Sequence, residues 1–238
     1  MAIQAEKAEK EALETYYRVR RGIGYLGFVL PLVLIGGGLI AARAVEPSIS
    51  DYYHTIMRDL YVAVIAATGV FLLAYSGYRP GVDETISDDK VATIAGLAAL
   101  GVAFFPNISV AMSERPASFW QFALGNQITA YVHYACAFIF LSALGFMSYS
   151  RFSRTDDLVR RKIYRRCGLV IYAATAGVVV TSAIKMFGPL GPQKIVNDWL
   201  LVLWAEAVGI WAFSVAWLVK GKADERLRRL IRTATSGS

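Results

Sequence analysis

The sequence has few of the residues and motifs on which many soluble enzymes depend. It contains two histidines and two cysteines, and 18% of its 238 residues are charged. His54 and His133 form no HExxH or HxxxH zinc motif, and no GxSxG sequence marks a serine hydrolase of the common α/β type. Cys136 and Cys167 are too few for a disulfide framework. The usual sequence signatures of zinc proteases, α/β-hydrolases and disulfide-rich secreted domains are therefore absent.

Long apolar runs are what the sequence has in abundance. Hydrophobic residues make up 56% of the chain, and its mean hydropathy is +0.45. A membrane core of roughly 30 Å requires about 20 helical residues, and six runs reach that length. The fold class that we predict is all-α, a polytopic integral membrane bundle of six transmembrane helices. The predicted spans are Gly22–Val45, Met57–Tyr78, Val91–Met112, Gln127–Ser148, Cys167–Gly188 and Asp198–Val219.

The basic residues predict how these spans are oriented. By this topology, 20 of the 25 lysines and arginines fall on one side, in the N-terminal segment, two of the connecting loops and the C-terminal tail. Basic residues near span ends favour the cytoplasm, so both termini are expected there, in an integral cell membrane such as a bacterial inner membrane. The predicted parts are a polar cytoplasmic helix (1–21), the six-helix domain (22–220) and a basic cytoplasmic tail (221–238).

The net charge of +7 has a membrane explanation. Basic loops attract anionic lipid of the inner leaflet, and no nucleic-acid-binding module accompanies the charge. We therefore expect membrane lipid as a partner and no nucleic acid. A homo-oligomer or a partner in a membrane complex stays open.

Polar residues gather on the other, non-cytoplasmic side of the predicted bundle. The loop SISDYYHTIMRDL (residues 48–60) lies there, and Glu206 is the most deeply placed acid of the spans. An ionisable group in a bilayer costs about 2.5 to 3.5 kcal/mol unless it meets a partner or water. We predict an outward-facing polar pocket walled by His133, Lys185 and Glu206 and roofed by this loop. The candidate catalytic residues are Glu206, His133, Asp59 and His54, and the candidate substrate-binding residues are Ser50, Asp51, Asn107, Lys185 and Asp198.

Several chemistries are compatible with such a pocket in different degrees. His54 and His133 with a carboxylate could hold zinc, but two histidines without motif spacing make metal the weaker interpretation, and we expect no metal and no cofactor. Proton-coupled transport would use Glu206 as a relay, yet no chain of carboxylates continues inward. Ser48 and Ser50 are candidate nucleophiles without an elbow motif.

Four short motifs resemble one membrane family. They are ISD (residues 49–51) in the first external loop, AGLAALGVAFF in the third span, YVHYACAFIF in the fourth and WAEAVGIWAF in the last. Together they resemble the six-span DRAM/Frag/Sfk family, whose members are associated with autophagy and lysosomal regulation, remodelling of glycolipid anchors and lipid organisation. The resemblance implies that Ile49, Ser50, Asp51, His133 and Glu206 are its recurrent polar positions. After ISD the chain continues YYHTIMRD, where the family would lead us to expect a Gly/Thr/Pro-rich segment.

The function predicted from the sequence is recognition or remodelling of a lipid headgroup in the outward-facing pocket. The alternative is a non-catalytic accessory or lipid-organising subunit of a membrane complex, in which the same residues are structural. Whether the protein is an enzyme stays open at this point.

Overall fold

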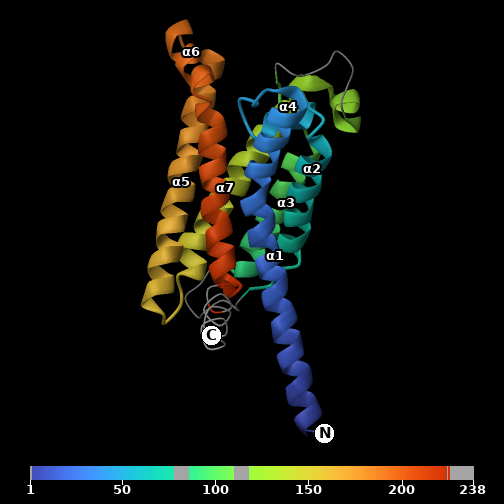
Figure 1. Ribbon diagram of the computed structural model, residues 1–238, viewed down its shortest axis with the longest axis vertical. Coiled ribbons are helices and arrows are strands. Elements are labelled where there is room, and N and C mark those ends of the chain that lie inside the picture. The colour runs from blue at the N-terminus through green and yellow to red at the C-terminus, as the bar shows by residue number, and fades with distance from the viewer. Residues whose placement is uncertain (1, 78–85, 110–117, 224, 226–238) are drawn as a thin grey trace, which may run out of the picture.

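The computed structural model describes residues 2–77, 86–109, 118–223 and 225, and its regular elements over these residues are all helices. Figure 1 shows them as a bundle of long helices, with the N-terminal part of α1 projecting below it. The α-helices are α1 (Ala2–Ala42), α2 (Arg58–Leu73), α3 (Asp88–Phe104), α4 (Phe119–Phe146), α5 (Leu158–Phe187), α6 (Leu190–Asp198) and α7 (Leu201–Lys220). A 3₁₀ helix, η1 (Ser50–His54), follows α1, and a π-helix, η2 (Met147–Phe152), extends α4.

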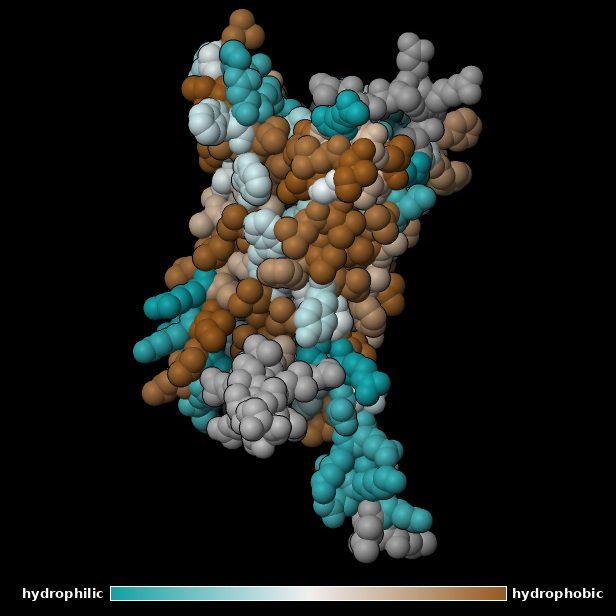
Figure 2. Space-filling view, viewed as in Figure 1, coloured by the Kyte–Doolittle hydropathy of each residue, from teal (hydrophilic) through white to brown (hydrophobic). Residues whose placement is uncertain are grey.

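Each of the six predicted spans falls on one of the α-helices, and four of these helices are long and apolar enough to cross a membrane. These four are α1, α4 with η2, α5 and α7. The remaining two, α2 and α3, have 16 and 17 residues. Figure 2 shows apolar side chains over most of the body of the molecule and hydrophilic ones on the projecting part of α1. This distribution is that of a membrane protein, whose lipid-facing surface stays apolar.

Local sequence explains where the helices begin and end. The Asp157 carboxylate accepts hydrogen bonds from the amides of Val159 and Arg160, so α5 begins nine residues before the predicted span. α3 ends at Phe104, well before the predicted Met112, because the residue preceding Pro106 is disfavoured in helical conformation. Phe105 is extended instead. Residue 112 itself lies outside the described residues.

The predicted start of the last span is wrong by three residues. Leu200 adopts a left-handed conformation (φ 50°, ψ 41°), which ends the short helix α6 before α7 begins. Asp198 therefore closes α6 and does not open α7. The segment FGPLGPQKIVND (residues 187–198) contains this extra helix. At the other end of the chain, α1 runs without interruption through the predicted boundary at residue 21, and most of the predicted tail lies outside the described residues.

The six long helices pack in a closed ring. Each of α1 to α5 packs on the next helix of the chain, and α7 closes the ring by packing on both α5 and α1 (Figure 1). Small residues permit the closest approaches: a Cβ added to Gly96 would lie 2.7 Å from the Gly69 carbonyl oxygen of α2. Gly209 of α7 faces α5 in a similar way, since an added Cβ would lie 3.2 Å from the Ala174 Cβ.

The ring gives the molecule two ends. α1, α3 and α5 end at the upper end of Figure 1, while α2, α4 and α7 begin there, with η1 between α1 and α2. The lower end carries η2 and a group of buried charges that we call the lower cluster: Arg20, Arg21, Asp88, Arg151 and Lys220. Its four cations, Arg20, Arg21, Arg151 and Lys220, are buried in the protein, whereas Lys162, Arg165 and Arg166 of the same end are exposed.

Candidate functional site

The loop between α1 and α2 brings its polar residues over the upper end of the bundle. The Asp51 amide donates to Ser48 Oγ at 3.0 Å, and Thr55 Oγ1 donates to the Tyr52 carbonyl at 2.9 Å. These local bonds favour a tight turn over a continued helix. The resulting 3₁₀ helix η1 buries Ser50, Asp51, Tyr52 and Tyr53. Its polar side chains therefore need partners from the helices beneath them.

Glu206 of α7 is one of those partners. Its Oε2 accepts from the Ile49 amide at 2.6 Å, and its Oε1 lies 3.4 Å from Ser50 Oγ. A second bond, from the Leu203 amide to the Pro47 carbonyl at 3.1 Å, fastens the same loop to the start of α7. The Glu206 side chain nevertheless stays partly exposed. Both carboxylate oxygens face the loop, so the contact between Glu206 and the loop is charge-assisted.

His133 of α4 meets the same serine from the other side. Its Nε2 lies 3.0 Å from Ser50 Oγ, and its Nδ1 lies 2.6 Å from the Phe105 carbonyl oxygen. A carbonyl can only accept, so Nδ1 carries a hydrogen. In the neutral imidazole, Nε2 is then the acceptor that faces the Ser50 hydroxyl. His133 is 1% exposed, which holds this ring in one position.

Asp51 joins the third and fifth helices to the loop. Its Oδ1 accepts from Asn107 Nδ2 at 2.6 Å, and its Oδ2 lies 3.7 Å from Lys185 Nζ. The side chain of Asp51 is 1% exposed and that of Lys185 is 30% exposed. A buried carboxylate requires such a cation, because an unpaired charge in this setting is costly. We call Ser50, Asp51, Asn107, His133, Lys185 and Glu206 the upper cluster.

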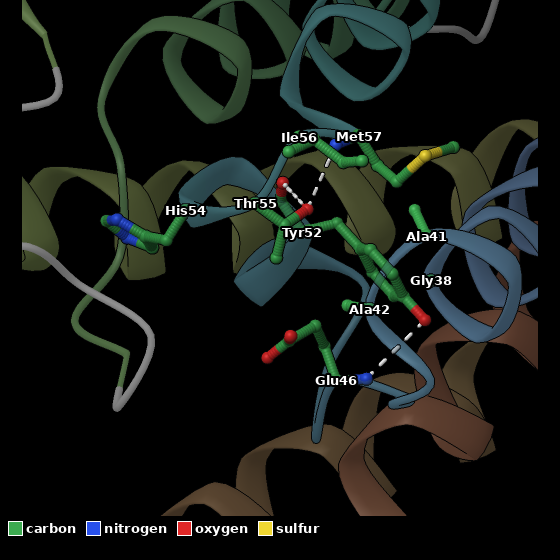
Figure 3. Close-up of a pocket in the computed structure, with 9 residues that line it drawn as sticks. All are labelled: Gly38, Ala41, Ala42, Glu46, Tyr52, His54, Thr55, Ile56 and Met57. Carbon is green, nitrogen blue, oxygen red and sulfur yellow. Dashed lines mark hydrogen bonds between the residues drawn. The ribbon is translucent and has the colours of Figure 1, made fainter.

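A cavity of about 420 Å³ lies beside the upper cluster, between the end of α1 and η1. Figure 3 shows the Tyr52 ring beside the small residues of α1, with Glu46 near it and the His54 side chain directed away from the ring. His54 Nε2 donates to the Asn107 carbonyl at 2.9 Å, which ties the cavity to the upper cluster. The predicted pocket walls His133, Lys185 and Glu206 do not line this cavity.

The carboxylate of Glu46 has no hydrogen bond or ion pair within the described part of the chain. Partial burial, and then the nearby charge of Asp51, raise the pKa of Glu46 above its ordinary value, while Lys185 opposes that rise. The cavity thus carries one carboxylate and one imidazole on an otherwise apolar wall, and its volume lies within the usual range for small-ligand sites.

Two of the predicted site residues lie outside this arrangement. Asp59 is exposed in the first turn of α2 and makes no contact with the upper cluster. Asp198 is exposed at the end of α6 and pairs with Lys194 at 2.6 Å, because the left-handed Leu200 separates it from α7. Asp198 and Glu206 therefore lie on different helices. His54 lines the cavity instead of reaching Ser50 or Glu206.

Three further groups belong to the site that the sequence alone did not reveal. They are the Ile49 amide, the Phe105 carbonyl and the Glu46 carboxylate. The first two are backbone groups, whose direction no residue pattern gives. Glu46 had a usable signal, since it is an acid placed directly between an apolar run and the polar loop.

The described residues contain no group of three or more His, Cys, Asp or Glu side chains arranged to hold a metal ion. Comparison with protein-family models, with curated proteins and with solved structures finds no match. The resemblance to the DRAM/Frag/Sfk family therefore stays a prediction carried by its four motifs.

Proposed function

We propose that this protein is a six-span membrane protein whose upper end, on the non-cytoplasmic side, binds a lipid headgroup. The lower end is assigned to the cytoplasm because basic residues gather there. We count α2 and α3 among the six spans because their 16 and 17 helical residues cover about 24 to 26 Å. Extended residues also continue α3 toward the upper end. This topology sets the upper cluster at the level of the headgroups.

One observation carries the proposal: the ammonium group of Lys185 belongs to a side chain that is 30% exposed, in a cluster whose other charges are turned toward protein partners. Lys185 pairs with the buried Asp51 carboxylate and still keeps an accessible side, and the Glu206 carboxylate lies in the same cluster. A phospholipid headgroup offers a phosphate for the ammonium group and, in zwitterionic lipids, a cationic group for a carboxylate. The neighbouring cavity adds room for part of that headgroup.

A second candidate function has its own support. Glu206 accepts from the Ile49 amide, and the Leu203 amide donates to Pro47, so α7 fastens the first loop at two points. In this second candidate function, the upper cluster acts as a latch that holds the first loop closed, and the protein is an accessory subunit. The two candidates predict different effects of removing the Glu206 charge: loss of lipid retention for the headgroup site and loss of stability for the latch.

The substitution Glu206→Gln separates these two functions. It keeps the side-chain volume and one acceptor oxygen while removing the charge, so the fold should survive with a stability loss of about 1 kcal/mol. We expect purified wild-type protein to retain phospholipid in mild detergent, and Glu206→Gln to retain about tenfold less, as loss of one charge-assisted contact predicts. Native mass spectrometry measures the retained lipid.

The matched control is Asp198→Asn, which removes an exposed acid of the same end from a surface ion pair. It should retain lipid as the wild type does. A Glu206→Gln protein that melts at the wild-type temperature with unchanged lipid would end the headgroup proposal. A variant with unchanged lipid and a melting temperature lowered by many degrees would favour the latch.

A further inference from the structure

We propose that Ser50 is a nucleophile and His133 its general base, together able to cleave an ester bond of a membrane lipid. This inference rests on the proposed lipid site and adds a reaction to it. The two residues lie 83 positions apart in the chain and come from η1 and α4.

The hydrogen bonds around His133 give it the properties of a base. The Phe105 carbonyl binds Nδ1–H at 2.6 Å, so the neutral ring directs the lone pair of Nε2 at Ser50 Oγ, 3.0 Å away. In serine hydrolases a carboxylate holds the imidazole in this way; here a backbone carbonyl does so. A nucleophile, a base and an orienting acceptor are thus in hydrogen-bond contact.

Ser50 has a second acceptor in Glu206, at 3.4 Å from its hydroxyl oxygen. The bond to His133 is shorter, so the hydroxyl hydrogen favours the imidazole. Glu206 also holds the Ile49 amide at 2.6 Å, directly before the serine. Glu206 is therefore a positioning residue, since it fixes the backbone that presents Ser50 to His133.

Lys185 is the group through which a bound lipid would approach the serine. Ser50 is 8% exposed, whereas the Lys185 side chain is 30% exposed in the same cluster. The ester groups of a phospholipid lie next to its headgroup phosphate, so a phosphate bound at Lys185 would bring an ester group toward the upper cluster. Lys185 is the cation of the upper cluster, and a cation favours the negative charge that develops on an ester carbonyl oxygen.

The reaction balances without a redox partner. Ser50 Oγ forms a bond to the ester carbonyl carbon while its proton passes to His133 Nε2. The carbon–oxygen ester bond then breaks, and His133 returns the proton to the leaving alcohol, which leaves an acyl group on Ser50. Water, activated by the same imidazole, releases the fatty acid and restores the serine hydroxyl.

A fluorophosphonate probe tests this assignment, because it reacts with activated serines. We expect the full-length protein in mild detergent to be labelled at Ser50, as located by peptide mass spectrometry. Ser50→Ala and His133→Gln should each lose at least about tenfold of the labelling. The control is Ser76→Ala, which changes an exposed serine at the other end of the bundle and should leave the labelling of Ser50 as in the wild type.

A second measurement uses vesicles of phosphatidylethanolamine and phosphatidylglycerol in ester-linked and ether-linked forms. Fatty acid should be released from the ester-linked vesicles alone, and Ser50→Ala should abolish the release. A wild-type protein that is neither labelled nor active on the ester vesicles overturns the proposal, as does labelling that persists in Ser50→Ala.

Different results would reject the proposed lipid site and the proposed reaction. Ser50→Ala should melt near the wild-type temperature and retain phospholipid as the wild type does, since the charges of Lys185 and Glu206 remain. Full lipid retention in the wild type without labelling would reject the nucleophile and keep the headgroup site. Labelling of Ser50 without any lipid retention would reject the headgroup site.

Discussion

The upper and lower clusters both combine acidic and basic side chains but bury them differently. In the lower cluster, Arg151 and Asp88 form an ion pair at 3.4 Å with both side chains at most 5% exposed. Lys220 Nζ lies 4.9 Å from the centre of the Phe152 ring, and Trp217 and Tyr75 pack against that ring. In the upper cluster, the polar groups are bound mainly to a loop, and the Lys185 side chain stays 30% exposed.

This difference indicates different tasks. Charges enclosed by aromatic rings and by each other have no room for a ligand, and removing one member leaves a buried charge unpaired. The lower cluster therefore serves to join the helix ends. An upper cluster that keeps an accessible ammonium group gives up some of that stability, as binding and catalytic sites commonly do. Stability should thus depend more on the lower cluster, and ligand binding more on the upper one.

The largest expected effect is on the lower ion pair. Asp88→Asn removes the carboxylate that pairs with Arg151 and should lower the free energy of unfolding by about 3 to 5 kcal/mol. The neighbouring exposed residue gives the matched control, since Asp89→Asn should change it by about 0.5 kcal/mol at most. Unfolding in mild detergent measures both. Equal losses for Asp88→Asn and Glu206→Gln would remove the distinction between the clusters.

A smaller effect is expected where α5 and α7 carry the upper cluster. A side chain at Gly209 would meet Ala174 of α5 at 3.2 Å, so Gly209→Val should cost about 1 to 3 kcal/mol through overpacking. Because α5 also carries Lys185, displacement of this helix should reduce lipid retention as well. Gly36→Val is the control, since no atom lies within 4 Å of a Cβ added there. Lipid retention that survives a clear loss of stability in Gly209→Val would show that α5 does not position the site.

The smallest effect on stability is expected from two exposed residues that report the topology. Asp156→Cys at the lower end and Asn197→Cys at the upper end, in a background with Cys136→Ala and Cys167→Ala, should each change stability by about 0.5 kcal/mol at most. A membrane-impermeant maleimide should label the upper variant in intact cells and the lower variant only after permeabilisation. Labelling of both from the same side would contradict the six-span topology and the external site.

Much of the helical framework could be predicted because its cause is local. An apolar run of about 20 residues favours a helix wherever it lies, and each of the six runs falls on one. Errors occurred where one backbone conformation decides the outcome. α3 ends earlier than predicted because Pro106 follows Phe105. The left-handed Leu200 separates α6, which contains Asp198, from α7. A positive φ at a leucine has no signal in the residue pattern.

The site was predicted in its members but not in its connections. Ser50, Asp51, Asn107, His133, Lys185 and Glu206 could be named because polar residues near the ends of apolar helices require partners. Asp59 satisfied the same criterion, but the packing of α2 turns it outward. A helix that is apolar on nearly every side has no distinct polar face, so the sequence could not say which polar residues point into the bundle.

The sequence by itself determined that this chain is helical, that several of its helices are long and apolar enough to cross a membrane, and which polar residues stand near their ends, because hydrophobicity, helix length and charge are properties of short segments. Tertiary structure alone decided that Ser50 meets His133 across 83 residues and that the Ile49 amide meets Glu206 across 157. Contacts over such separations depend on which helices become neighbours when the ring closes. They also depend on backbone groups, such as the Phe105 carbonyl, whose directions only the folded chain fixes.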